Sequence, residues 1–367
     1  MHNTRSLTTR STHRHTRITR TAMCAAALLA LLVPTVLAPT AALAAPQSDD
    51  TSISSSTSPR HGGSPATVTV LADGLDGTSG ADLGPDGALY VTEATLGRIT
   101  RVDTRTGEKS VYASGLPPAV IGLGGAIDIA FVGRTAYVLV TLVGPDVGGD
   151  QVSGIYRVDD ADSFTVIADL GAFSRANPPA TQFDIPSGLQ FALEPVRGGF
   201  LVTDGHHNRV LHVSKSGNVR ELVAFDNIVP TGLAVSGRTV YMGEAGPVPH
   251  APEDGKVVRF SVGKPVARTV ASGFSLIVDV ELNRCGRLFA LSQGDEPGDV
   301  PAGSPALPDS GELLKVTKNG TFQVIAAGLD LPTSVDFGRR AAYVVAGDEV
   351  LRITGGAVSG KRGGCWK

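Results

Sequence analysis

Residues 80–116 read GADLGPDGALYVTEATLGRITRVDTRTGEKSVYASGL, and this stretch decides the fold of the chain. Four short segments in it alternate apolar and polar residues, at 81–83, 88–93, 98–102 and 109–113. Turns rich in Gly, Pro and Asp separate them, which is typical of short antiparallel strands. The stretch therefore predicts one four-stranded antiparallel unit.

The third strand of this unit returns five more times. Each copy carries a basic residue at its fourth position, and a strand of period two places these side chains in one equivalent environment. We expect solvated positions on the blade surface for them, while a binding role stays open. The copies are RITRV (98–102), GIYRV (154–158), RVLHV (209–213), KVVRF (256–260), ELLKV (312–316) and EVLRI (349–353), with Arg101, Arg157, His212, Arg259, Lys315 and Arg352 at the fourth position.

Six such units predict an all-β, six-bladed β-propeller over residues 67–356, with blades of four antiparallel strands. The composition agrees, because 45 residues are Gly and no long helical period follows residue 45. One fourth-strand sequence, at 68–75, stands before any first strand, and the last blade (333–353) lacks a fourth strand. We therefore expect the N-terminal strand to close the ring and remove its exposed edges.

The first 44 residues have the pattern of a signal peptide. Their basic residues precede an apolar core at 25–37 and an A-x-A site at 42–44. Pro34 and Pro39 interrupt a core already short for a membrane span, which favours cleavage over an anchor. We expect a secreted or extracytoplasmic protein without a stable membrane anchor, with a disordered linker at 45–66 and a C-terminal tail at 357–367.

The net charge of the chain bears on its possible partners. Residues 1–44 hold five of the 32 basic residues and none of the 35 acidic ones, so the remainder carries a formal net charge of −8. This net negative charge argues against nucleic acid as a partner.

Two cysteines, Cys285 and Cys365, lie beyond the predicted signal segment. In an oxidising compartment a disulfide between them is the simplest expectation, with two free thiols as the alternative.

The ends of second strands and the starts of first strands meet on one face of a propeller. The sequence places Glu93, Asp128, Asp204, Glu244 and Asp279 on this rim, where carboxylates could bind a cation or act as acid and base. The alternative is that each carboxylate caps its own turn. His206, beside His207, either flanks such a site or is solvated. No G-x-S-x-G, H-E-x-x-H or P-loop pattern occurs.

Several stretches resemble the ScyD/ScyE-type family of exported propellers. They are GPDGALYVTEA (84–94), GRITRVD (97–103), VIADLGAF (166–173), VPTGLAV (229–235) and YMGEAGPVPHAPEDGKVVRF (241–260). TDGHHNRVLHV (203–213) also resembles an NHL repeat. The resemblance implies an exported propeller and does not specify an activity.

Gluconolactonase-like propellers, a more distant likeness, hold a divalent metal through one Glu, two Asn and one Asp on the rim. An Asn there precedes a first-strand Gly-Leu-Ala. The equivalent places here are Ser79, Ile127, Ser187, Thr231, Val278 and Thr333, so the metal set does not transfer. We therefore expect no metal and no cofactor.

These observations favour a monomeric propeller that binds a small molecule or a protein at its acidic rim. Two alternatives stay open. One is an enzyme, a hydrolase or coupling enzyme on a small molecule, with Glu93, Asp204 and Glu244 as acid and base. The other is a structural protein of the cell envelope.

Overall fold

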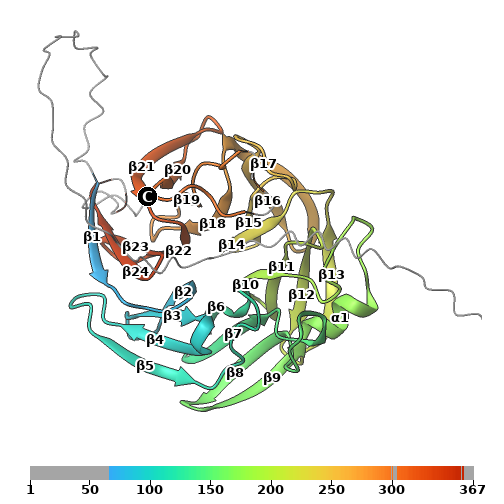
Figure 1. Cartoon of the computed structure of the whole chain (residues 1–367). Helices are drawn as coiled ribbons and strands as arrows, with labels where there is room; N and C mark the ends of the chain where they lie inside the picture. The colour runs from blue at the N-terminus through green and yellow to red at the C-terminus, as the bar shows by residue number, and fades with distance from the viewer. Residues whose placement is uncertain (1–65, 299, 301–303, 357, 359–367) are drawn as a thin grey trace, which may run out of the picture.

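The computed structural model describes residues 66–298, 300, 304–356 and 358. Six four-stranded antiparallel sheets stand around a central axis like the blades of a propeller (Figure 1). The predicted all-β, six-bladed architecture is therefore confirmed. The predicted signal peptide (1–44), the predicted linker up to residue 65, and Cys365 lie outside the described residues.

Each of the first five blades uses four consecutive strands, with the first strand nearest the axis and the fourth at the outside. Blade one contains β2 (Thr78–Leu83), β3 (Leu89–Glu93), β4 (Arg98–Val102) and β5 (Lys109–Ser114). Blade two contains β6 (Gly125–Val132), β7 (Thr135–Thr141), β8 (Gly154–Asp160) and β9 (Ser163–Asp169). Blade three contains β10 (Gln190–Val196), β11 (Gly199–Asp204), β12 (Arg209–Ser214) and β13 (Val219–Ala224). Blade four contains β14 (Pro230–Ser236), β15 (Thr239–Glu244), β16 (Gly255–Ser261) and β17 (Lys264–Phe274). Blade five contains β18 (Ile277–Leu282), β19 (Leu288–Ser292), β20 (Gly311–Val316) and β21 (Phe322–Leu329).

Blade six joins the two ends of the described chain. Its strands β22 (Pro332–Phe337), β23 (Ala341–Ala346) and β24 (Glu349–Thr354) come from the C-terminal part, and β1 (Thr67–Ala72) supplies the fourth. β1 runs antiparallel to β24, with Val68 opposite Ile353 and Val70 opposite Leu351. Figure 1 shows the blue β1 beside the red β24. The predicted closure of the ring by the N-terminal strand is confirmed.

The hydrophobic core is divided among the blade interfaces. Each of the six interfaces encloses its own apolar cluster, built mainly from second and third strands. Between blades five and six, for example, the rings of Phe289 and Phe337 lie 4.5 Å apart between their centroids. Both faces of these second strands are covered, which is why their central residues are mostly apolar.

The basic residues of the third strands lie at the blade surface, as expected. Each faces the aromatic or Leu position of the second strand, as Arg101 faces Tyr90 and Arg352 faces Tyr343. All six side chains are half-buried or exposed. Arg101 pairs with Asp86, with 2.7 Å between Nη2 and Oδ2.

One α-helix lies in the insertion between blades two and three. It is α1 (Leu170–Ala176), and the Asp169 carboxylate caps it by accepting the N–H of Ala172 at 2.7 Å. Among the described residues, no helix is long and apolar enough to span a membrane.

Candidate functional site

A cavity of about 790 Å³ opens where the central channel reaches the predicted rim. All six innermost strands contribute to it, through the residues at or near the start of each strand. Its side walls come from two insertions, at 181–184 between blades two and three and at 248–250 in blade four. Loops on a rigid scaffold are the usual place for binding residues, and here they stand over the axis of the propeller.

Two carboxylates, Asp128 on β6 and Asp279 on β18, form the acidic part of the floor. Each carboxylate bridges to the next blade. Asp128 accepts the N–H of Leu193 at 2.7 Å, and Asp279 accepts the N–H of Val335 at 2.8 Å. Burial raises the pKa of both, against the lowering effect of these backbone N–H groups; the pKa of Asp279 rises to about 7.

The two floor carboxylates sit in matching environments. A Cβ added to Gly80 would lie 2.3 Å from Oδ1 of Asp128, and one added to Gly232 would lie 2.2 Å from Oδ1 of Asp279. Gly80 and Gly232 belong to the first strands of blades one and four, each preceding the blade that carries the carboxylate. Glycine is required at both places because only a residue without Cβ leaves room for the neighbouring carboxylate.

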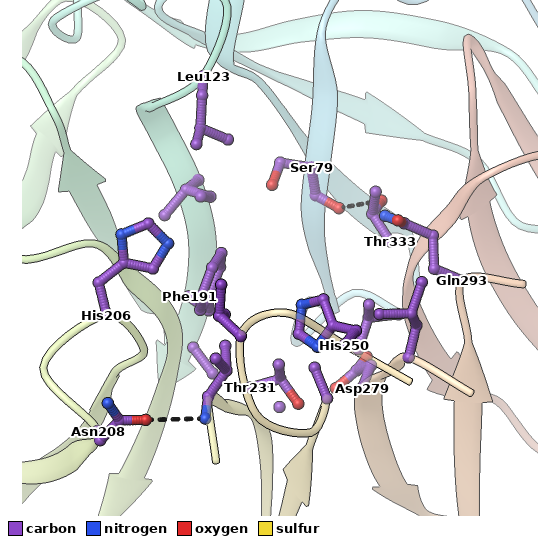
Figure 2. Close-up of a pocket in the computed structure, with 18 of the residues that line it drawn as sticks. Ser79, Leu123, Phe191, His206, Asn208, Thr231, His250, Asp279, Gln293 and Thr333 are labelled. Carbon is purple, nitrogen blue, oxygen red and sulfur yellow. Dashed lines mark hydrogen bonds between the residues drawn. The ribbon is translucent and has the colours of Figure 1, made fainter. Parts of the chain in front are cut away.

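Two histidines, His206 and His250, stand on the wall of the cavity (Figure 2). Burial lowers the pKa of both imidazoles, so each is neutral at pH 7. Nδ1 of His250 is buried, and a hydrogen bond with the backbone of Gly246 acts to raise the pKa of the ring against the larger effect of burial. A neutral imidazole has an unprotonated ring nitrogen that can accept a proton or a hydrogen bond from a bound molecule.

Two asparagines on the wall hold loops in place. Oδ1 of Asn208 accepts the N–H groups of Ile228 and Val229, at 2.9 Å each (Figure 2). Asn227 exchanges two hydrogen bonds with the backbone of Val248, at 2.8 and 3.1 Å. Their main task is therefore to fix the shape of the wall.

The other predicted rim carboxylates lie away from the cavity. Glu93, Asp204 and Glu244 are buried at the ends of β3, β11 and β15, and none of them lines it. Each faces a basic residue at the start of the next strand: Glu93 faces Arg98, Asp204 faces Arg209 and Glu244 faces Lys256. The structure thus brings Asp128, Asp279 and His206 together and places the other three in ion pairs between strands.

These ion pairs differ in how strongly the basic residue lowers the pKa of its carboxylate. Burial acts to raise the pKa of Glu93, but hydrogen bonds from Arg98 and Thr100 outweigh it, and the pKa is lowered. Burial raises the pKa of Glu244, whose Oε2 lies 3.5 Å from Nζ of Lys256. The sequence did carry a signal for these pairs, because a basic residue opens the third strand only in the blades whose second strand ends in a carboxylate.

Asp204 is the centre of a larger buried network. Its Oδ2 accepts from Nε of Arg209 at 3.0 Å and from Oγ of Ser174 at 3.2 Å. Arg209 also donates to the backbone oxygen of Asn177 at 2.7 Å, and Nε2 of His207 lies 3.0 Å from the backbone oxygen of Ile185. The network ties α1 and the insertion behind it to blade three, and so positions one wall of the cavity.

Sequence reasoning missed two kinds of residue near the site. His250 lies in the loop insertion of blade four, and only the fold shows that it lines the cavity. Four further carboxylates line the channel beneath the floor, and burial raises the pKa of each. Their signal was present as an acidic residue at the axis-facing position of an apolar first strand. These four are Asp82, Glu194, Glu281 and Asp336.

Among the described residues, no group of three or more His, Cys, Asp or Glu side chains could hold a metal ion. The amide positions that a gluconolactonase-like site would need hold Ser79, Ile127, Thr231, Val278 and Thr333 along the cavity. The residues present therefore do not fit that metal set.

No protein-family model matches the chain, and no curated protein matches it. Several solved structures are similar to the chain. The chain is a six-bladed propeller with distant structural relatives. A gluconolactonase from Xanthomonas campestris superposes with a TM-score of 0.56 at 13% identity, over 79% of this chain and 90% of that one. Regucalcin, a calcium-binding protein from Agrobacterium tumefaciens, gives 0.54 at 13% identity, over 79% and 94%. The PQQ-bound aldose sugar dehydrogenase of Streptomyces coelicolor gives 0.53 at 14% identity, over 79% and 98%. At such identities the likeness establishes the fold alone.

Proposed function

We propose that this protein is an exported β-propeller that binds a small molecule in the cavity at the mouth of its channel. The observation that carries the proposal is the cavity itself, whose volume of about 790 Å³ lies within the ~300–1,000 Å³ of small-molecule sites. Aliphatic and aromatic side chains line much of it, and a few polar groups converge on it. A concave site of this size suits a small ligand better than a protein surface.

Export and membership of the ScyD/ScyE-type family remain part of the proposal. Export rests on the basic segment, apolar core and A-x-A site of residues 1–44. The structural relatives include a lactonase, a sugar dehydrogenase and a calcium-binding protein. Because one fold carries such different activities, the ligand has to be inferred from the residues of this cavity.

A ligand screen by thermal shift tests the binding role. We expect some members of a neutral and charged fragment library to raise the melting temperature of the full chain. Ser79→Trp would fill the cavity from its partly exposed edge and should remove these shifts. The matched control is Ser110→Trp, on the exposed outer strand of blade one. If every hit stabilises the Ser79→Trp variant as much as the wild type, the cavity is not the binding site.

An enzyme that acts on the bound molecule is the second candidate. The observation that favours it is the pair of neutral imidazoles, His206 and His250, that line one cavity. Neutral imidazoles can remove a proton from a bound substrate at neutral pH, and general-base catalysis of this kind contributes ~10²–10⁴-fold. Glu93 and Asp204 are less suited to this task because basic residues already neutralise them.

Turnover of ester, lactone and amide substrates by the full chain tests the second candidate. His250→Asn should abolish turnover while ligand binding stays within a few-fold of wild type. His212→Asn, a half-buried histidine on β12 that does not line the cavity, is the matched control and should change neither. Turnover that survives in both variants would assign the chemistry to other groups.

A further inference from the structure

The charged groups around the cavity are all of one sign. Among the described residues that line it, Asp128, Asp184 and Asp279 carry acidic side chains, and no Lys or Arg is present. The two histidines do not compensate, because burial holds their pKa low and leaves them neutral. An anionic ligand would therefore meet repulsion and no cationic partner in this cavity.

The channel beneath the floor holds further acidic groups, which a bound cation would help to ionise. Asp82, Glu194, Glu281 and Asp336 point into it from four blades. Burial raises the pKa values of all four, and repulsion from neighbouring carboxyl groups adds to the rise for Asp82, Glu194 and Glu281. Asp82 and Asp336 hydrogen-bond each other, as two acids that share a proton do. Arg284, exposed in the turn after β18, acts to lower the pKa of Asp336, but burial outweighs it.

The apolar part of the wall suits the same ligand class. Phe183 and Phe191 both line the cavity, as do Leu123, Ile127 and Leu276. Aromatic faces attract cations, and in sites shielded from water the attraction strengthens. A molecule with an apolar body and one positive group would bury its body against these side chains and turn its charge toward the acidic floor.

Building on the binding role of this cavity, we propose that its ligand is a mainly apolar molecule bearing a protonated amino group, held by Asp128 or Asp279. The two carboxylates come from blades two and five, which lie opposite each other in the ring (Figure 1). Each already accepts two backbone N–H groups and has further lone pairs to accept an ammonium N–H. The amine supplies the positive charge that the described lining lacks.

Binding of such a ligand is linked to protonation of the floor. The pKa of Asp279 is raised to about 7, mainly by burial, and an ammonium group favours the ionised form. Affinity for the amine should therefore rise between pH about 6 and 8, with release of protons on binding. The other acids that face Asp279 act in the same direction; they are Asp128 on β6, Glu194 on β10, Glu281 on β18 and Asp336 on β22.

Calorimetric titration of the full chain with three probes of one shape tests the proposal. The probes are naphthylethylamine, naphthylethanol and naphthylacetate. We expect the amine to bind at least ~10-fold more tightly than the alcohol, because a charged hydrogen bond contributes ~1.5–3 kcal/mol, and the carboxylate to bind most weakly. Asp279→Asn or Asp128→Asn should remove most of the amine's advantage and leave the alcohol unchanged. Asp162→Asn, an exposed surface change, is the control.

The affinities of the three probes for the wild-type protein test the proposal even if the Asp279→Asn or Asp128→Asn variant fails to fold. An alcohol or carboxylate that binds as tightly as the amine overturns the cationic ligand class and leaves the binding role of the cavity intact. An amine affinity that does not change between pH 6 and 8 overturns the role of Asp279. If all three probes bind the Ser79→Trp variant as they bind the wild type, the cavity is not their site and the proposed function fails with the inference.

Discussion

The carboxylate of Asp279 accepts the backbone N–H of Val335 at 2.8 Å, so a side chain of blade five completes the inner strand of blade six. The same link recurs elsewhere around the axis, where Asp82 accepts from Phe131 at 2.8 Å and Asp336 accepts from Leu83 at 2.6 Å. These links join the blades and also gather acidic groups in the channel. The stability of the fold and the charge of the site are therefore coupled.

The first prediction is that stability falls as the pH rises from about 4 to about 7. The folded-state pKa of Asp82 and of Asp279 is about 7, above the usual value of 3.8, so the folded state holds protons that the unfolded chain has released. We expect the melting temperature to drop by roughly 5 °C across this window. Asp82→Asn should flatten the slope, whereas Asp162→Asn should preserve it. A wild-type curve that rises over this range would contradict the assignment.

The second prediction concerns the glycines beside the floor. Gly232→Ala would place a Cβ 2.2 Å from Oδ1 of Asp279. Backbone atoms of neighbouring residues lie close to the same point, so the added methyl group has no free space. We expect a loss of about 1–3 kcal/mol in the free energy of unfolding, measured in urea, as is usual for overpacking. Gly122→Ala is the control, because nothing lies within 4 Å of its Cβ. Equal stability of the two variants would show that the floor can relax.

The third prediction separates two strand-end ion pairs. Arg209→Met should cost about 3–5 kcal/mol, because it leaves the fully buried Asp204 without its cation. Arg98→Met should cost less. The Arg98 side chain is 33% exposed, and Glu93 keeps hydrogen bonds from Thr100 and from the N–H of Asp76. Urea denaturation of both variants gives the order, and a larger loss for Arg98→Met would reverse this account.

The fourth prediction concerns closure of the ring. A chain lacking residues 67–72 would leave β24 as an open edge and remove Ala72 from the cluster between blades six and one. We expect a lower melting temperature and self-association through the new edge, measured by calorimetry and light scattering. A monomer with an unchanged melting temperature would mean that β1 contributes little.

The fifth prediction is the disulfide between Cys285 and Cys365. Cys285 lies in the turn between β18 and β19, and Cys365 is outside the described residues. The bond would close a long loop, for which the chain-entropy model allows ~4 kcal/mol. Thiol titration of the denatured, unreduced protein should find neither cysteine free in protein from an oxidising compartment. Two free thiols would rule out the pairing.

Local pattern was enough to predict the scaffold. Alternation of apolar and polar residues in the six copies of the third strand predicted the blades, and the misplaced strand at 68–75 predicted the closure between β1 and β24. These features depend on period and turn chemistry, which a linear sequence carries directly. The rim positions of Asp128 and Asp279 followed from the same register, whereas the sequence left open whether His206 flanks the site or is solvated.

Tertiary structure decided which polar residues face the ligand. Glu93 and Asp128 are both rim carboxylates by position, yet Glu93 is neutralised by Arg98 while Asp128 borders the cavity. His250 carried no local signal and reaches the wall only because its insertion folds over the axis. A strand's period specifies which face a side chain occupies. Its partners come from other blades or from loops, so packing alone determines whether a charge is paired, buried or left for a ligand.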